Sequence, residues 1–101
     1  MVDKKEKTWE YDCNLTFYGH KIVRFTITDH FRMNHPELSL DLIVKLVKKL
    51  NNKEAELTDY SGSRKVFRWK TTYRGQSYRL IFWFKDNETN HLWIRNCYPV
   101  N

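Results

Sequence analysis

The chain has no apolar run of the roughly 18 residues that a membrane-spanning helix needs. Its start, Met1 to Lys7, is charged, and no apolar stretch follows that would mark a signal peptide. Low-complexity segments and internal repeats are absent as well. We therefore expect a cytoplasmic protein that does not engage a membrane.

Cysteine is scarce, with Cys13 and Cys97 the only two in the chain. Neither belongs to a Cys-x-x-Cys or Cys/His spacing that would hold zinc, so we predict no metal site. Two buried thiols are expected in a reducing compartment. The alternative is a disulfide, which requires the first and last strands to be neighbours.

Several catalytic motifs are also missing. The chain has no Gly-rich phosphate loop, no Gly-x-Ser-x-Gly elbow and no His-Glu-x-x-His. These absences remove nucleotide hydrolysis on a phosphate loop, the nucleophile-elbow hydrolases and the zinc proteases that carry the last motif. We predict no cofactor.

Positive charge is what the chain has in excess, and it is concentrated in one part. The formal net charge is +6, from 18 Lys and Arg against 12 Asp and Glu. Residues 1–59 hold 10 cations and 10 carboxylates, so the whole excess lies in residues 60–101, which also hold 10 of the 16 aromatics. Cations interleaved with aromatic rings indicate a surface for nucleic acid. The alternative is a basic, solvated sheet face.

The size and the hydrophobic fraction of 41% predict one globular domain over residues 8–101, after a flexible lead-in of residues 1–7. Alternation from Trp9 to Tyr18, and again over residues 23–28, predicts a β-hairpin that turns at Gly19-His20. Thr28 or Asp29 is expected to cap a short helical turn, and Ser39 a helix over residues 40–50. Further strands are expected near 54–59, 65–73, 77–85 and 91–98.

These elements predict an α+β fold. It would comprise an N-terminal β-hairpin, one or two helices, and then a twisted antiparallel sheet of about four strands, with the helices packed on one face. A two-residue loop at Arg74-Gly75 pairs Tyr73 with Gln76 and, further along, Phe67 with Phe82, so that apolar residues share one face.

The opposite face of the same hairpin gathers cations. Lys70 pairs with Arg79 there, Arg68 pairs with Ile81, and Arg95 on the last strand is expected opposite Ile81. Like charges in opposing positions destabilise a sheet by about 0.2–1 kcal/mol, which a bound anion would relieve. The carboxylates of residues 60–101 are Asp86 and Glu88, both at the far turn, so we expect this face to bind phosphate.

The residues suit RNA cleavage without a metal. That reaction needs a base for the 2′-OH proton, cations for the phosphorane charge and an acid for the 5′-oxygen. Arg79 and Lys70 suit the electrostatic role, since a guanidinium holds phosphate in a bidentate manner. His30 and His35, which flank Arg32, are candidate acid or base groups. Tyr98 is a further candidate, but alternation places it on the core face with Ile94, so a bulge or a break must precede it.

The stretches Tyr60-Ser-Gly-Ser-Arg-Lys-Val, Tyr78-Arg79-Leu-Ile-Phe and Trp93-Ile-Arg95-Asn-Cys-Tyr98 resemble RelE/YoeB-type toxins, of the barnase–colicin–RelE-like ribonuclease superfamily. The resemblance covers roughly residues 57–98. It implies a RelE/barnase-like fold and cleavage of RNA, often mRNA on the ribosome. It also implies neutralisation by an antitoxin or immunity protein.

On this resemblance Arg79 matches the family's strand arginine, and Tyr98 its tyrosine near the C-terminus. Arg64, Lys65 or Lys70 matches its further basic residue. The segment from Ile27 to Arg32 resembles the entry of phage and polymorphic-toxin nucleases, in which a histidine is functional. The N-terminal hairpin departs from the family plan, where a single strand precedes the helices.

Our hypothesis is a toxin-type endoribonuclease that cleaves RNA by 2′-OH attack and leaves a 2′,3′-cyclic phosphate. Its substrate would be free RNA or ribosome-bound mRNA or tRNA. Residues expected to contact the RNA are Arg32, Arg64, Lys65, Arg68, Trp83 and Arg95. One alternative is a non-catalytic nucleic-acid-binding module that uses the same face, with Trp83 and Trp93 as stacking platforms. A weaker one is a small protein whose basic face docks an acidic protein.

Overall fold

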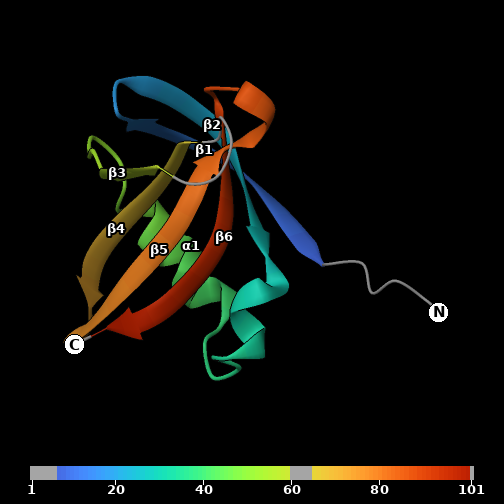
Figure 1. Ribbon diagram of the computed structural model, residues 1–101, viewed down its shortest axis with the longest axis vertical. Coiled ribbons are helices and arrows are strands. Elements are labelled where there is room, and N and C mark those ends of the chain that lie inside the picture. The colour runs from blue at the N-terminus through green and yellow to red at the C-terminus, as the bar shows by residue number, and fades with distance from the viewer. Residues whose placement is uncertain (1–6, 60–64, 101) are drawn as a thin grey trace.

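A computed structural model describes residues 7–59 and 65–100, which form one six-stranded sheet in the order β1-β2-β6-β5-β4-β3 (Figure 1). The strands are β1 (Thr8–Phe17), β2 (His20–Thr28), β3 (Glu56–Asp59), β4 (Lys65–Tyr73), β5 (Gln76–Phe84) and β6 (His91–Val100). The other regular elements of the described residues are one α-helix, α1 (Leu40–Lys48), and two 3₁₀ turns, η1 (Asp29–Met33) and η2 (Lys85–Asn87).

The predicted fold class is wrong, because the sheet has six strands and is mixed rather than antiparallel. The hairpin of β1 and β2 does not precede a four-stranded antiparallel sheet; it is part of a single mixed sheet, because β2 pairs with β6 in parallel. Thr26 lies beside Trp93 and Ile27 beside Ile94 in this pairing. Partners so far apart in the sequence leave no local signal, since a parallel pair has no connecting turn. The structure is thus more sheet-dominated than the α+β plan.

Both tight hairpins turn on the same backbone geometry. Tyr18 and Gly19 have φ of 54° and 81°, and Arg74 and Gly75 have φ of 53° and 80°. Two consecutive positive φ angles match the twist of the flanking strands, which is why such two-residue loops favour glycine. The second loop and its register are as predicted. The first turn lies one residue earlier than predicted, with Phe17 opposite His20.

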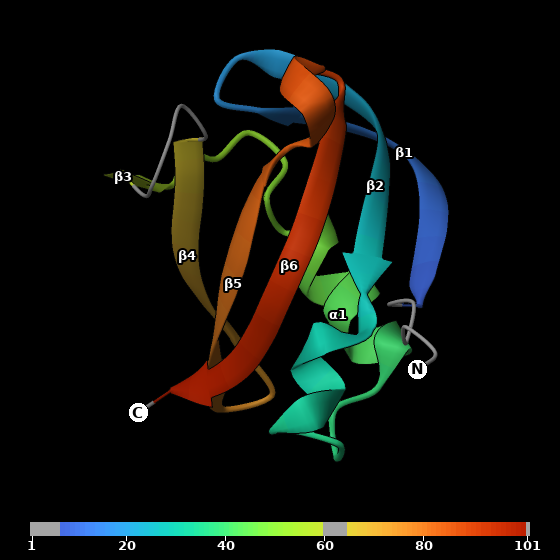
Figure 2. The same cartoon turned by 45° about the vertical axis from the view of Figure 1, so that its right-hand side comes forward.

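The single α-helix covers one face of the sheet, as Figures 1 and 2 show. Ser39 caps it as predicted, because its hydroxyl accepts a hydrogen bond from the Leu42 N–H at 3.1 Å. The helix buries Ile43, Leu46 and Val47 against the strands. It ends at Lys48 rather than at Leu50, although the Leu50 side chain is still fully buried.

The chain after α1 is attached to the end of β1. The Asn51 side chain accepts a hydrogen bond from the Thr16 N–H at 2.8 Å, and the Asn52 N–H donates to the Thr16 carbonyl at 2.6 Å. Asn52 has a φ of 63°, a left-handed conformation that asparagine tolerates better than most residues. The Asn-Asn pair therefore fastens the segment after the helix to the sheet.

The two cysteines are free thiols. Cys13 is on β1 and Cys97 on β6, and β2 lies between these strands. Burial raises the pKa of Cys97 to about 12, so its thiol stays protonated at neutral pH. Within the described part of the chain, no helix is long and apolar enough to cross a membrane.

Candidate nucleic-acid interface

The strands β4, β5 and β6 have two different faces. On the face toward α1, Phe67, Leu80 and Phe82 are buried in the core. The opposite face, which we call the outer face, carries the alternate residues of the same strands, since successive side chains of a strand point to opposite sides. Its residues include Arg68, Lys70, Arg79, Ile81, Trp83, Trp93, Arg95 and Tyr98.

A β-bulge in β6 brings Tyr98 onto the outer face. Phe82 pairs with Ile94 but Ile81 pairs with Asn96, so Arg95 is the extra residue between two register positions. A bulge shifts the alternation of the residues that follow it by one place. Cys97 consequently takes the buried position opposite Leu80, and Tyr98 lies directly opposite Arg79. Arg95 was expected opposite Ile81 and instead lies in the bulge.

The structure brings His35, rather than His30, to this tyrosine. The segment after β2 packs against β6, as Figure 2 shows at the end of that strand. There the His35 ring stacks on Tyr98, with ring centroids 6.4 Å apart and 24° between the planes. Nδ1 of His35 lies 3.3 Å from a carboxylate oxygen of Glu37. His30, half-buried in η1, makes no hydrogen bond or ion pair within the described residues.

Lys70 and Arg79 lie opposite each other on β4 and β5, as predicted from the hairpin register. In the described residues no ion pair joins Arg79 to a carboxylate. Lys70 is exposed and Arg79 is half-buried. These two cations and Tyr98 therefore form one row across three adjacent strands, and His35 closes its Tyr98 end.

Arg68 lies two residues before Lys70 on the same face, but a carboxylate engages it. Its guanidinium donates to Glu56 on β3 at 2.7 Å. This hydrogen bond, reinforced by the arginine's charge, lowers the pKa of Glu56, so the carboxylate stays ionised at neutral pH. We expected the only nearby carboxylates to be Asp86 and Glu88; Glu56 comes from the electrically neutral part of the sequence.

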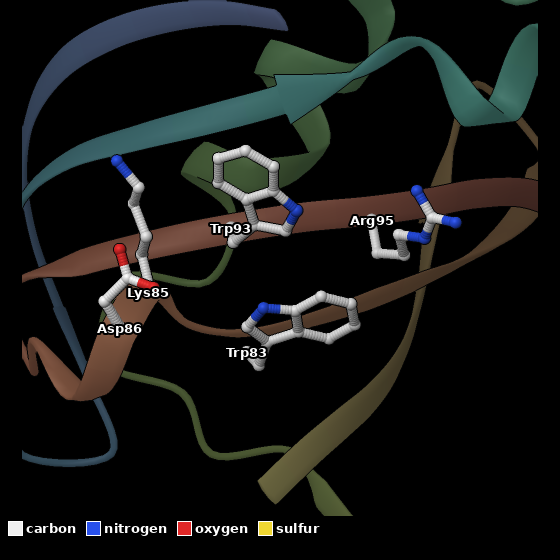
Figure 3. A pocket seen from close by; sticks show the side chains of 5 residues that line it. All are labelled: Trp83, Lys85, Asp86, Trp93 and Arg95. Carbon is white, nitrogen blue, oxygen red and sulfur yellow. The ribbon is translucent and has the colours of Figure 1, made fainter. Parts of the chain in front are cut away.

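Further along the outer face, an open pocket of about 470 Å³ lies over β5 and β6. Trp83 and Trp93, directly opposite each other, line it. Lys85, Asp86 and Arg95 complete the lining (Figure 3). The Lys85 ammonium lies 5.7 Å from the Trp93 ring centroid. Sequence reasoning gave a nucleic-acid-binding role to the two tryptophans and to Arg95 but not to Lys85. Lys85 lies just after the end of β5, in η2.

Two predicted RNA-binding residues, Arg32 and Lys65, do not join this face. Arg32 is exposed and lies over the ring of Trp9, 5.0 Å from its centroid. Trp9 pairs with Ile27, a core residue, so the two lie toward the side of the sheet that carries α1. Lys65 alternates with Val66 and Arg68 and therefore points to the other side from Arg68. Arg64 lies outside the described residues.

His91 is a buried histidine of the outer face that sequence reasoning discounted. It is 6% exposed, and its Nε2 lies 2.7 Å from the Thr26 hydroxyl. Burial, and then the charge of Lys85, lower the pKa of His91 below its ordinary value, so the ring is neutral at pH 7. It ties β6 to β2 and is not available to a substrate.

The described residues hold no cluster of three or more His, Cys, Asp or Glu that could bind a metal ion. Comparison of the chain with models of known families, with curated proteins and with solved structures gives no match. The assignment of a function therefore depends on the geometry of the outer face.

Proposed function

We propose that the protein is an endoribonuclease that cleaves RNA by attack of the 2′-OH on the adjacent phosphate, without a metal. The observation that carries the proposal is the bulge at Arg95, which places Tyr98 opposite Arg79 and against His35. The reaction requires proton-transferring groups and a cation around one phosphate. These residue types meet at one end of the outer face.

His35 is the group best placed to accept the 2′-OH proton. With Nδ1–H donated to Glu37, the other ring nitrogen carries a lone pair. The Tyr98 ring lies nearly parallel to the imidazole, with the ring centroids 6.4 Å apart. A base held by a carboxylate in this way presents its free nitrogen in one orientation.

Arg79 and Lys70 would hold the reacting phosphate and stabilise its charge as it becomes pentacoordinate. A guanidinium donates two parallel hydrogen bonds to phosphate oxygens, whereas the lysine acts as a point charge. The 2′-oxygen forms its bond to phosphorus as the 5′-oxygen leaves. Tyr98 would then protonate the 5′-oxygen, giving a 2′,3′-cyclic phosphate and a 5′-hydroxyl.

The resemblance of residues 57–98 to RelE/YoeB-type toxins supports the same chemistry, because Arg79 and Tyr98 are the matched residues. On that resemblance we propose that the protein acts in the cytoplasm as a toxin. Its substrate would be free or ribosome-bound RNA, and a cognate antitoxin or immunity protein would neutralise it.

The test is incubation of labelled RNA with the protein in EDTA, with and without ribosomes, followed by analysis of the product ends. We expect 2′,3′-cyclic phosphate and 5′-hydroxyl ends, because the nucleophile is the neighbouring hydroxyl. The matched control is the same RNA with 2′-O-methyl groups, which should stay intact. Strict dependence on magnesium, or cleavage of the methylated RNA, would rule out this chemistry.

A second candidate is a non-catalytic nucleic-acid-binding module that uses the same face. The tryptophan pair that lines the pocket favours it, because aromatic platforms bind bases without any proton transfer. In that case RNA would bind with a steep salt dependence and emerge intact.

A further inference from the structure

The tryptophan pocket is separate from the row formed by Lys70, Arg79 and Tyr98. Trp83 and Arg79 are both on β5, four residues apart, which corresponds to about 13 Å along a strand. The pocket's volume of about 470 Å³ lies within the range of small-molecule sites. The proton-transfer chemistry proposed above makes no use of it.

Two aromatic residues line the pocket. Trp83 and Trp93 face each other across β5 and β6, and both are partly exposed. Two indole rings on the solvent side of a sheet cost stability unless something covers them, because apolar surface stays in contact with water. Figure 3 shows both rings between Lys85 at one end of the pocket lining and Arg95 at the other.

Different charged residues line the two ends of the pocket. Lys85 and Asp86 line one end of the pocket, and Arg95 lines the other end. Arg95 is also the bulge residue of β6. The register that places Tyr98 opposite Arg79 begins at the next residue. Arg95 therefore lies on the side of the tryptophans that is nearer to the proposed cleavage site.

We propose that this pocket is a subsite for an unpaired nucleobase of the RNA. The base stacks on Trp83 and Trp93, and its phosphate lies at Arg95, on the side toward Arg79. A stacked strand advances about 3.4 Å per nucleotide, so about four stacked nucleotides, or fewer extended ones, connect the pocket to the reacting phosphate. The subsite extends the proposed nuclease site, so the choice of RNA as its ligand rests on the proposed function. A pocket that takes an unpaired base selects single-stranded over double-stranded substrate.

The test uses a fluorescently labelled single-stranded DNA octanucleotide, which lacks the 2′-OH and so stays intact while its binding is measured by anisotropy. We expect Trp93→Ala and Trp83→Ala each to weaken binding about tenfold, the effect typical of losing a stacked base. Trp93→Phe should keep most of the affinity. Arg95→Ala should reduce the salt dependence by about one phosphate contact.

Trp9→Ala is the matched control, since Trp9 is also a partly exposed tryptophan beside a cation but lies on the other side of the sheet. It should leave the affinity unchanged. The same octanucleotide in a duplex should bind more weakly, because its bases are not available for stacking. A polyglutamate of equal charge should compete poorly.

The subsite would be wrong if the Trp83 and Trp93 variants bound like the wild type, or if duplex or polyglutamate bound as well as the single strand. These results are independent of cleavage. A protein that binds the octanucleotide through the tryptophans but leaves RNA intact would keep the subsite and refute the nuclease. A double variant without Trp83 and Trp93 that still cleaves RNA with unaltered rate and affinity would refute the subsite and keep the nuclease.

Discussion

The two faces of β4, β5 and β6 are made by the same alternation and differ in almost every property. The face toward α1 is dry and aromatic, with Phe67 and Phe82 stacked at 5.6 Å and Leu80 fully buried beside them. The outer face places Lys70 directly opposite Arg79 and leaves two tryptophans partly in water.

Stability explains only the first of these faces. Burying a large apolar side chain contributes about 1.5–3 kcal/mol, whereas like charges in opposing positions cost about 0.2–1 kcal/mol. The difference teaches that the helix face holds the fold, whereas the outer face carries the groups of the proposed site.

The largest effect should come from breaking the helix face at Phe82. Its ring is fully buried and lies 5.2 Å from the ring of Phe17. Phe82→Ala should lower the free energy of unfolding by about 3–5 kcal/mol, because it leaves a cavity in a packed core. Urea denaturation followed by circular dichroism measures it. Trp83→Ala, at the next position but on the outer face, is the control and should cost much less; equal losses would contradict the distinction between the faces.

Breaking the outer face should leave stability intact and abolish activity. Arg79→Ala should slow RNA cleavage by about 10²–10³-fold, the usual loss when one charge-stabilising group is removed. The cleavage rate of labelled RNA under single-turnover conditions measures it, with the unfolding curve as a check on the fold.

Arg68→Ala is the matched control for Arg79, because it removes the same charge from the same face. Glu56 already engages the Arg68 guanidinium, so its loss should weaken RNA binding without a comparable loss of cleavage rate. If the two variants lost cleavage equally, the outer face would act as a diffuse charge and not as a site.

Local patterns predicted the hairpins, the helix cap and the pairing of β4 with β5, since each depends on neighbours in the sequence. The register from Phe67–Phe82 to Tyr73–Gln76 follows from the two-residue loop alone. The mixed sheet could not be predicted in this way, because the β2–β6 pairing joins the two ends of the chain. Nothing near Thr26 specifies that Trp93 will lie beside it.

The candidate site was predictable in its cations and not in its proton-transferring groups. Alternation placed Tyr98 in the core, and the bulge that reverses this lies at Arg95, where the sequence has neither glycine nor proline to mark it. The choice between His30 and His35 depended on how η1 packs against β6, a tertiary contact. The Glu56 partner of Arg68 was missed for the same reason.

The two histidines sharpen the comparison, because only one of them reaches the outer face. His35→Ala should slow cleavage about 10²-fold, the lower end of what a positioned acid or base contributes. His30→Ala, the control, should cleave like the wild type. A His30 variant that loses activity while the His35 variant keeps it would reverse the assignment.

The smallest expected effect concerns His91, the buried histidine of the outer face, and it appears as a dependence of stability on pH. Because burial lowers its folded pKa, the unfolded chain takes up a proton there at a higher pH than the folded chain does. As the pH falls below about 6.5, the ordinary histidine value, protonation favours the unfolded state, so stability decreases until the folded pKa is passed. Unfolding curves between pH 7.5 and 5 (roughly a unit either side of that value) should show a smaller decrease for His91→Gln, whose amide can still bond the Thr26 hydroxyl. Parallel curves for the two proteins would mean that His91 is as well solvated in the fold as in the unfolded chain.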